Sequence, residues 1–228
     1  MGHAREDMTA TAKARSDVYG LLAIIFRAAP TVDCLEQLKI QGFTDILNSF
    51  GQSLGEGVKF SPVEKLAEDL AVEYTRLFIG PGPRLSPHES VHLEIDGYEG
   101  GLWGTKTVEV KAFMEATGLE IDDSFGGMPD HLAAELEFMQ KLLQKEAEAW
   151  TKEDHQLGAN ILKIEKRFYD EHLSQWVSKF CDKVIDATKH PFYKQFSEVT
   201  QGFIDFEEET LRTLLDEASE GHCQSKIA

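Results

Sequence analysis

The sequence of 228 residues is poor in cysteine and contains no long apolar run. Its three cysteines, Cys34, Cys181 and Cys223, lie far apart and form no C-x-x-C pair, which argues against a structural zinc, an iron–sulfur cluster or a dithiol redox pair. No stretch reaches the roughly 18 apolar residues that cross a membrane, so membrane insertion is not expected. The N-terminus is polar and lacks the apolar segment of a secretory signal. These absences predict a protein of the cytoplasm.

Basic residues are scarce as well. Lys and Arg total 23 against 40 Asp and Glu, which gives a formal net charge of −17 at pH 7 with neutral histidines. A nucleic-acid-binding surface must neutralise phosphates with basic side chains, so this balance argues against a nucleic-acid partner. An acidic surface steers basic partners toward a protein, although many acidic proteins are simply soluble. The charge alone leaves both interpretations open.

What the sequence does contain is helical periodicity. Apolar residues recur three and four positions apart through most of the chain, and no stretch is rich in strand signals. The pattern predicts an all-α protein, a single-domain helical bundle of about seven to nine helices that spans residues 1–228. The apolar stripes occupy residues 18–29, 35–50, 66–77, 108–117, 132–143, 161–168, 173–185 and 192–214.

Two segments interrupt the helical pattern. Residues 79–104 are rich in glycine and proline and show no period, and such a long segment inside a compact domain is often functional. Gly118 fits the position just after a helix end, and the glycine- and aspartate-rich link, residues 118–128, could act as a hinge. Pro129 is then expected to open the next helix, because proline is favoured in a first turn.

Residues 88–92, His-Glu-Ser-Val-His, match the H-E-x-x-H pattern of zinc peptidases. On a helix this spacing places His88 and His92 on one face, with Glu89 as general base for a zinc-bound water. A further ligand would come from a later helix, where Glu115 or Glu135 could serve. The motif lies in the glycine-rich connection, however, where loop residues are expected and metal sites are not favoured. A zinc metallopeptidase is therefore the alternative function.

Other catalytic patterns are lacking. Residues 97–106 are rich in glycine but have no Gly-Lys-Ser/Thr ending and do not follow a strand, so no phosphate loop is present. No serine stands in a G-x-S-x-G motif, and no cysteine has an obvious general base nearby. The sequence thus predicts no catalytic residue and no cofactor. Asp130 and His131 stand at a predicted helix start, where the helix dipole alone explains the carboxylate.

Three segments match one known pattern when they are taken together. The first comprises residues 73–82 (EYTRLFIGPG) and continues at 85–91 (LSPHESV). The second, residues 129–139, reads PDHLAAELEFM, and the third, residues 168–180, has an F…H-L…W…F spacing. Their order and spacing resemble the TorD/DmsD-type, NarJ-related family of redox-enzyme maturation and Tat proofreading chaperones. The resemblance covers most of the chain, although the family's glutamate before P-x-D-H is missing. Histidines occupy the family's aromatic positions at 88 and 92.

The resemblance implies an all-helical cytoplasmic chaperone that is not an enzyme. It would bind the twin-arginine signal peptide of a molybdopterin-containing oxidoreductase precursor and hold this client for cofactor insertion before Tat export, as a monomer or homodimer. Such a leader has a basic head and an apolar body, which suit an acidic surface and an apolar groove between helices. The residues expected at the signal-peptide site are Leu77, Phe78 and Pro87 as apolar walls, Tyr74 as an aromatic wall, and Asp130 and His131 as polar contacts with an arginine.

Overall fold

The structure is a computed structural model that describes residues 2–40, 61–93, 101–119 and 127–224. These residues form helices, turns and loops, and no strand occurs among them, so the predicted all-α class is confirmed. The elements are α1 (Gly2–Arg27), α2 (Val32–Ile40), α5 (Val63–Tyr74), α6 (Glu89–His92), α7 (Thr105–Ala116), α8 (Leu132–Thr151), α9 (His155–Phe168), α10 (Ser174–Ala187) and α11 (Pro191–Gln224), with π-helical turns η1 (Thr75–Ile79) and η3 (Tyr169–Leu173).

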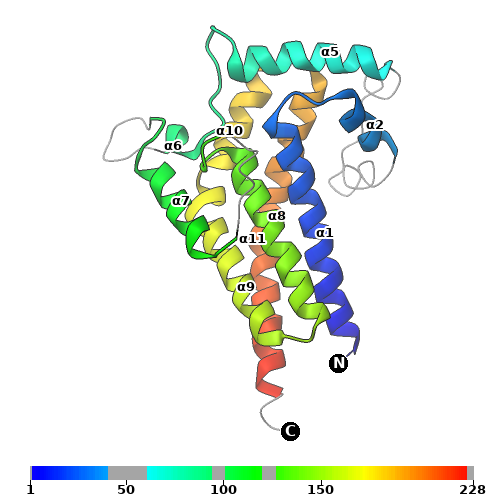
Figure 1. Ribbon diagram of the computed structural model, residues 1–228, viewed down its shortest axis with the longest axis vertical. Helices are drawn as coiled ribbons and strands as arrows, with labels where there is room; N and C mark the ends of the chain where they lie inside the picture. Colours follow the sequence, from blue (N-terminus) through cyan, green and yellow to red (C-terminus); the bar gives the residue numbers. More distant parts are fainter. Residues whose placement is uncertain (1, 41–60, 94–100, 120–126, 225–228) are drawn as a thin grey trace.

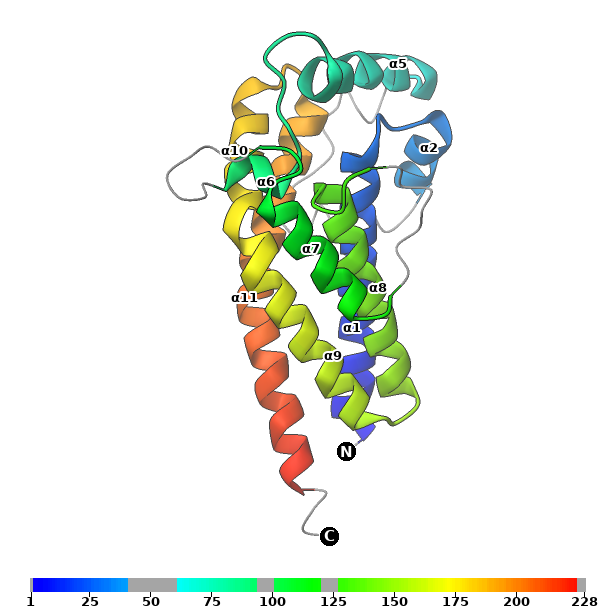
Figure 2. The same cartoon turned by 60° about the vertical axis from the view of Figure 1, so that its left-hand side comes forward.

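The long helices form a bundle. α1 packs along α8, α8 along α9, and α11 along both α9 and α10 (Figure 1). α5 lies across one end of the bundle, whereas α6 and α7 lie on its side (Figure 2). None of the described helices is long and apolar enough to cross a membrane.

Aromatic side chains from the predicted stripes fill the centre of this bundle. Phe138 and Phe168 join α8 to α9, with 4.7 Å between ring centroids. Phe26 and Phe180 join α1 to α10 at 5.9 Å. All four are buried, and burial of each such side chain contributes about 1.5–3 kcal/mol. Phe168 and Phe180 are positions that the apolar periodicity identified, whereas Phe26 and Phe138 lie beside the predicted positions of their stripes.

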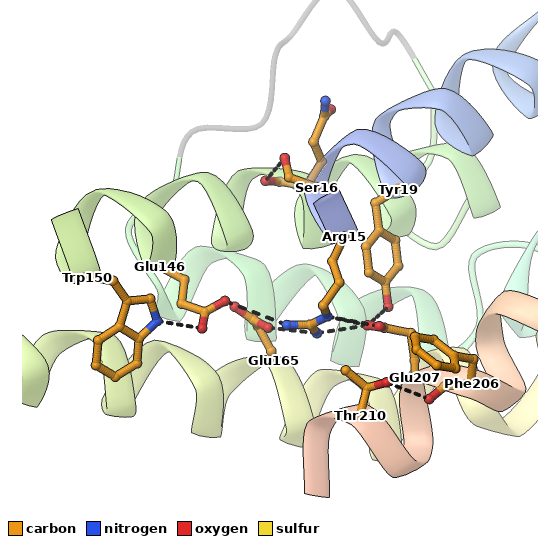
Figure 3. Close-up of polar contacts among 10 residues, drawn as sticks. Arg15, Ser16, Tyr19, Glu146, Trp150, Glu165, Phe206, Glu207 and Thr210 are labelled. Carbon is orange, nitrogen blue, oxygen red and sulfur yellow. Dashed lines mark hydrogen bonds and ion pairs between the residues drawn. The ribbon is translucent and has the colours of Figure 1, made fainter. Parts of the chain in front are cut away.

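A charged cluster lies inside the same bundle (Figure 3). The Arg15 guanidinium of α1 donates two hydrogen bonds to Glu207 of α11, from Nε to Oε1 (2.9 Å) and from Nη2 to Oε2 (2.8 Å). Its Nη2 also lies 3.0 Å from Glu165 of α9, and its Nη1 lies 3.6 Å from Glu146 of α8. One arginine thus faces three buried carboxyl groups. Burial and the charge of Glu146 raise the pKa of Glu165 well above its usual range, which favours a proton on this carboxyl group.

The helix expected to open at Pro129 begins instead at Leu132. His131 is its N-cap residue, and the His131 Nδ1 accepts the N–H of Ala133 at 3.1 Å. Gly118 has φ +68° just after α7 and ends that helix as predicted. The connection at 79–104, expected to be irregular, contains the short helix α6. Parts of this connection, of the 118–128 segment and of the 35–50 stripe lie outside the described residues.

Candidate functional site

Three of the six predicted site residues lie where α5 meets η1, and all three are buried. These are Tyr74, Leu77 and Phe78. The Tyr74 hydroxyl donates to the main-chain oxygens of Phe26 (3.1 Å) and Arg27 (3.0 Å), and burial raises the Tyr74 pKa to about 12. The Phe78 ring packs against the Tyr74 ring with 4.9 Å between centroids. The Tyr74 hydroxyl thus joins α5 to α1, whereas the Phe78 ring packs toward α10 and α11.

Pro87 and Asp130 meet where residues 86–92 pair with residues 127–132, an arrangement called here the α6–α8 junction. The N–H of Leu132 donates to the Pro87 oxygen (2.8 Å), and the N–H of Glu89 donates to the Asp130 main-chain oxygen (2.9 Å). The Asp130 side chain is fully buried, and its Oδ2 accepts the N–H of Ser90 (3.2 Å). Asp130 therefore satisfies free N–H groups of α6, and the expectation that it lies in the first turn of α8 was wrong.

Three neutral histidines surround this junction. The rings of His88 and His131 meet edge to face with 4.9 Å between centroids, and His92 stacks on Trp176 at 5.4 Å. Burial lowers the pKa of His131 to about 3, and it also lowers the pKa of His88 and His92. The histidines therefore carry no charge at neutral pH. His131 is the one predicted site residue whose side chain is partly exposed.

A buried acid–imidazole pair lies beneath the junction. The Glu89 Oε2 lies 2.9 Å from the His172 Nδ1, and both side chains are buried. Beside them, the Glu135 Oε2 accepts the indole N–H of Trp176 at 3.1 Å. Burial and the neighbouring charge of Glu89 raise the pKa of Glu135 well above its usual range, which favours its protonated form. The Glu89–His172 contact ties α6 to η3.

The H-E-x-x-H residues are not arranged as in a zinc peptidase. α6 comprises only residues 89–92, and His88 precedes it with extended dihedral angles (φ −128°, ψ 131°). The His88 ring therefore faces His131, while Glu89 is engaged by His172. No group of three or more His, Cys, Asp or Glu side chains in the described part of the chain is placed to hold a metal ion. The expectation that Glu89 is a loop residue was wrong, because Glu89 is buried on a helix.

An open groove lies next to the junction, between α7 and α9. The two helices lie side by side (Figure 2), and the space between them has a volume of about 1000 Å³. Ala112 and Ala116 leave it open because their side chains are short. Phe113, Ile164 and Leu93 add an apolar floor. This space is called the α7–α9 groove below.

One end of the α7–α9 groove gathers the carboxylates of Glu109 and Glu171 and is called here the acidic end, although Lys106 and Arg167 also line it. Near the start of α7, the Lys106 ammonium lies 2.8 Å from the Glu109 carboxylate. The hydrogen bond to Glu109 and the charges of Glu89 and Glu171 raise the pKa of Lys106. His172 also lines the groove, so the acidic end reaches the buried Glu89–His172 pair. A cation is stabilised at this end.

Neither the groove nor the partner of His172 was predicted from the sequence. A signal was available, because His172 falls four residues after Phe168 and four before Trp176 on an apolar stripe. An ionisable side chain at such a core position needs a buried partner. No local pattern could name Glu89 as that partner, since the two residues are 83 positions apart.

Comparison with known proteins identifies relatives over most of the chain. Residues 40–182 match the nitrate reductase delta subunit family. The Chaperone protein TorD of Vibrio parahaemolyticus is 22% identical over 215 residues, which cover 87% of this chain and 94% of that protein.

Two further relatives match over shorter stretches. The Tat proofreading chaperone DmsD of Salmonella typhimurium is 30% identical over 137 residues, 59% of this chain and 58% of that protein. The Perchlorate reductase assembly chaperone protein of Dechloromonas aromatica is 29% identical over 126 residues, 55% of this chain. That match spans little more than half the length of the perchlorate reductase chaperone, 53%.

Proposed function

This chain belongs to the nitrate reductase delta subunit family, and on that basis we propose that it is a maturation and proofreading chaperone for an oxidoreductase precursor. The proposed client carries a twin-arginine leader and receives a molybdopterin cofactor while the chaperone holds it in the cytoplasm. The family match over residues 40–182 carries this proposal, and relatives named for reductase assembly and Tat proofreading support it. The proposed activity is binding, without a catalysed step.

The physical character of the chain suits a leader peptide as ligand. A formal net charge of −17 attracts the leader's basic head over distances near the Debye length, about 8–10 Å at physiological salt. The α7–α9 groove offers accessible apolar side chains for the leader's apolar body. Electrostatic attraction of the leader's basic head and apolar contacts with its body would both contribute to binding.

The six predicted site residues take two roles in this proposal. His131 is partly exposed and neutral, and we assign it a direct polar contact with the leader. Pro87 and Asp130 are positioning residues, because they hold α6 against the start of α8. Tyr74, Leu77 and Phe78 are positioning residues in the core, where Tyr74 joins α5 to α1 and Phe78 packs against α10 and α11.

Co-purification tests the proposed function. The tagged full chain is expressed in its native host and isolated, and the bound proteins are identified by mass spectrometry. The expected result is one oxidoreductase precursor that still carries its leader. Deletion of the leader from that precursor should abolish or strongly reduce the recovery. Equal recovery without the leader would contradict leader recognition, and recovery of no oxidoreductase would contradict the proposed function.

A further inference from the structure

We propose that the α7–α9 groove is the place where the leader lies, with its apolar body on the groove floor and one arginine at the acidic end beside Lys106. The inference rests on the proposed function and adds the location and the orientation of the bound leader. It also assigns Lys106 a role, namely that of an internal cation that competes with the leader's arginine.

The floor of the groove is accessible and already formed. Ala112 and Ala116 are exposed and leave space beside α9, while the Arg167 guanidinium lies over the Phe113 ring, 5.0 Å from its centroid. The Phe113 ring is half-buried and is held in place by the rings of Phe168 (5.2 Å) and His172 (5.6 Å). A volume of about 1000 Å³ is at the upper end for ligand pockets and can accept several apolar side chains of a peptide. A preformed floor reduces the ordering cost of binding.

The acidic end supplies the complementary charge. Carboxylates from three different elements act on one position there: Glu109 of α7, Glu171 of η3 and the buried Glu89 of α6. Lys106 occupies this position in the free protein, 2.8 Å from Glu109. A leader arginine that enters here meets the same carboxylates and can bind one of them with two parallel hydrogen bonds, which an ammonium group cannot do.

The existing partners of these carboxylates are exchangeable. Glu171 is paired with Arg167 of the same helical run, at 2.7 Å between Nε and Oε1, and both side chains are exposed. Exposed pairs of this kind contribute little to stability, so they can be replaced by a ligand cation without a large cost. The Lys106 ammonium is carried by a flexible four-carbon side chain and can move into solvent when the arginine enters. Removal of Lys106 should therefore strengthen binding, whereas removal of Glu109 should weaken it.

The orientation follows from the arrangement of the two helices. Lys106 and Glu109 are near the start of α7, close to Glu171, whereas Ala116 is at the end of α7 and faces the groove with Ile164. The basic head of the leader therefore lies toward α6, and the apolar body extends along α7 toward its C-terminal end. Asp130 affects this site indirectly, since it holds α6 and thereby Glu89.

The test is a titration of a fluorescently labelled synthetic twin-arginine leader with the full chain and its variants. Ala112→Trp fills the groove and should weaken binding about tenfold or more, and Ala116→Trp should do the same. Val108→Trp is the matched control, because Val108 is on the same helix, is 65% exposed and does not line the groove. It should leave the affinity within about twofold.

The charge variants test the acidic end separately. Lys106→Gln should tighten leader binding by about three- to tenfold, and Glu109→Gln should weaken it by a similar factor. Lys111→Gln and Glu115→Gln are their controls, since this exposed pair lies on the same helix outside the groove. The leader affinity of each control variant should stay within about twofold of the wild-type affinity. A thermal melt of each variant establishes that it is folded.

Three outcomes have different meanings. Wild-type affinity in both tryptophan variants of the floor would overturn the groove while the proposed function stands. Weaker binding, or no change, in Lys106→Gln would overturn the competition by Lys106 and the placement of the arginine. Failure of the wild-type chain to bind the leader at all would overturn the proposed function together with the groove.

Discussion

The imidazole Nδ1 of His172 and the carboxylate Oε2 of Glu89 lie 2.9 Å apart, between side chains that are both buried in the core. Glu89 is on α6, whose first N–H groups are satisfied by Asp130, and His172 lines the α7–α9 groove. The contact therefore links the α6–α8 junction to the floor of the groove. Asp130 holds α6, and Glu89 of α6 contacts His172. Asp130 is thereby connected to the groove, although its own buried carboxylate does not line it.

We expect the variant Glu89→Ala to be less stable than wild type by about 1–3 kcal/mol, because the buried His172 Nδ1 loses its partner. The free energy of unfolding is measured by urea denaturation followed by circular dichroism. Glu115→Ala is the control, since Glu115 is exposed and takes part only in a surface pair with Lys111. It should change the stability by less than about 0.5 kcal/mol. Equal stability of Glu89→Ala and wild type would show that the buried contact contributes nothing.

The buried Glu165 predicts a pH dependence of stability. Because burial and the charge of Glu146 raise the pKa of Glu165 above 4.5, the folded protein binds a proton that the unfolded chain releases above this pH. The contribution of Glu165 to the free energy of unfolding is therefore fully present below pH 4.5. It is lost as the pH rises toward and through the folded-state pKa. Glu165→Gln imitates the protonated acid and should reduce this loss.

The measurement compares urea unfolding of wild type and Glu165→Gln at several pH values from about 5 to 8. The difference in the free energy of unfolding should grow with pH in favour of the variant, by at most about 1.4 kcal/mol per pH unit. Glu115→Gln removes an exposed carboxylate and should follow wild type. Parallel curves for wild type and Glu165→Gln would contradict a proton held in the Arg15 cluster.

Two glycines inside helices should respond oppositely to alanine. A Cβ at Gly158 would lie 2.7 Å from carbons of the buried Trp150 indole, which has no room to move. A Cβ at Gly20 would meet the end of the flexible Gln140 side chain, which can turn away. We therefore expect Gly158→Ala to lower the melting temperature. Gly20→Ala should raise the melting temperature or leave it unchanged, because alanine is favoured over glycine inside a helix by about 1 kcal/mol. A rise in both variants would contradict close packing of α9 against Trp150.

Much of the fold could be predicted from the sequence, because helical periodicity is a local signal. Phe168 and Phe180 were predicted stripe positions and are buried. The start of α8 was missed by three residues, because His131 supplies the cap and Pro129 lies in the pairing with α6 instead. A histidine cap and a pairing between distant segments leave no signal in the local pattern.

The candidate site was less predictable than the fold. The segment match predicted Pro87, Asp130 and His131 for the signal-peptide site, and the structure brings these three residues together at the α6–α8 junction. It could not indicate that Asp130 is buried, since burial depends on how α6 packs against η3 and α8. The α7–α9 groove was missed for a related reason: it arises where Ala112 and Ala116 fail to fill the space beside α9.

Salt should slow the association of the leader with the chain. With a net charge of −17 on the protein and arginines on the leader, screening between about 0.05 and 0.5 M salt should reduce the association rate constant about tenfold or more. The dissociation rate constant should change less, because the groove floor is apolar. Stopped-flow measurements with the labelled leader separate the two constants. An association rate that is constant across this range would contradict electrostatic steering.

Recognition of a twin-arginine leader by this chain is tested by calorimetric titration of the full chain with a synthetic leader and with a matched peptide whose two arginines are replaced by glutamine. We expect the leader to bind at one site per chain, and the glutamine peptide to bind with an affinity that is lower by about tenfold or more. Equal affinity for the two peptides, or no binding of either, would contradict this expectation.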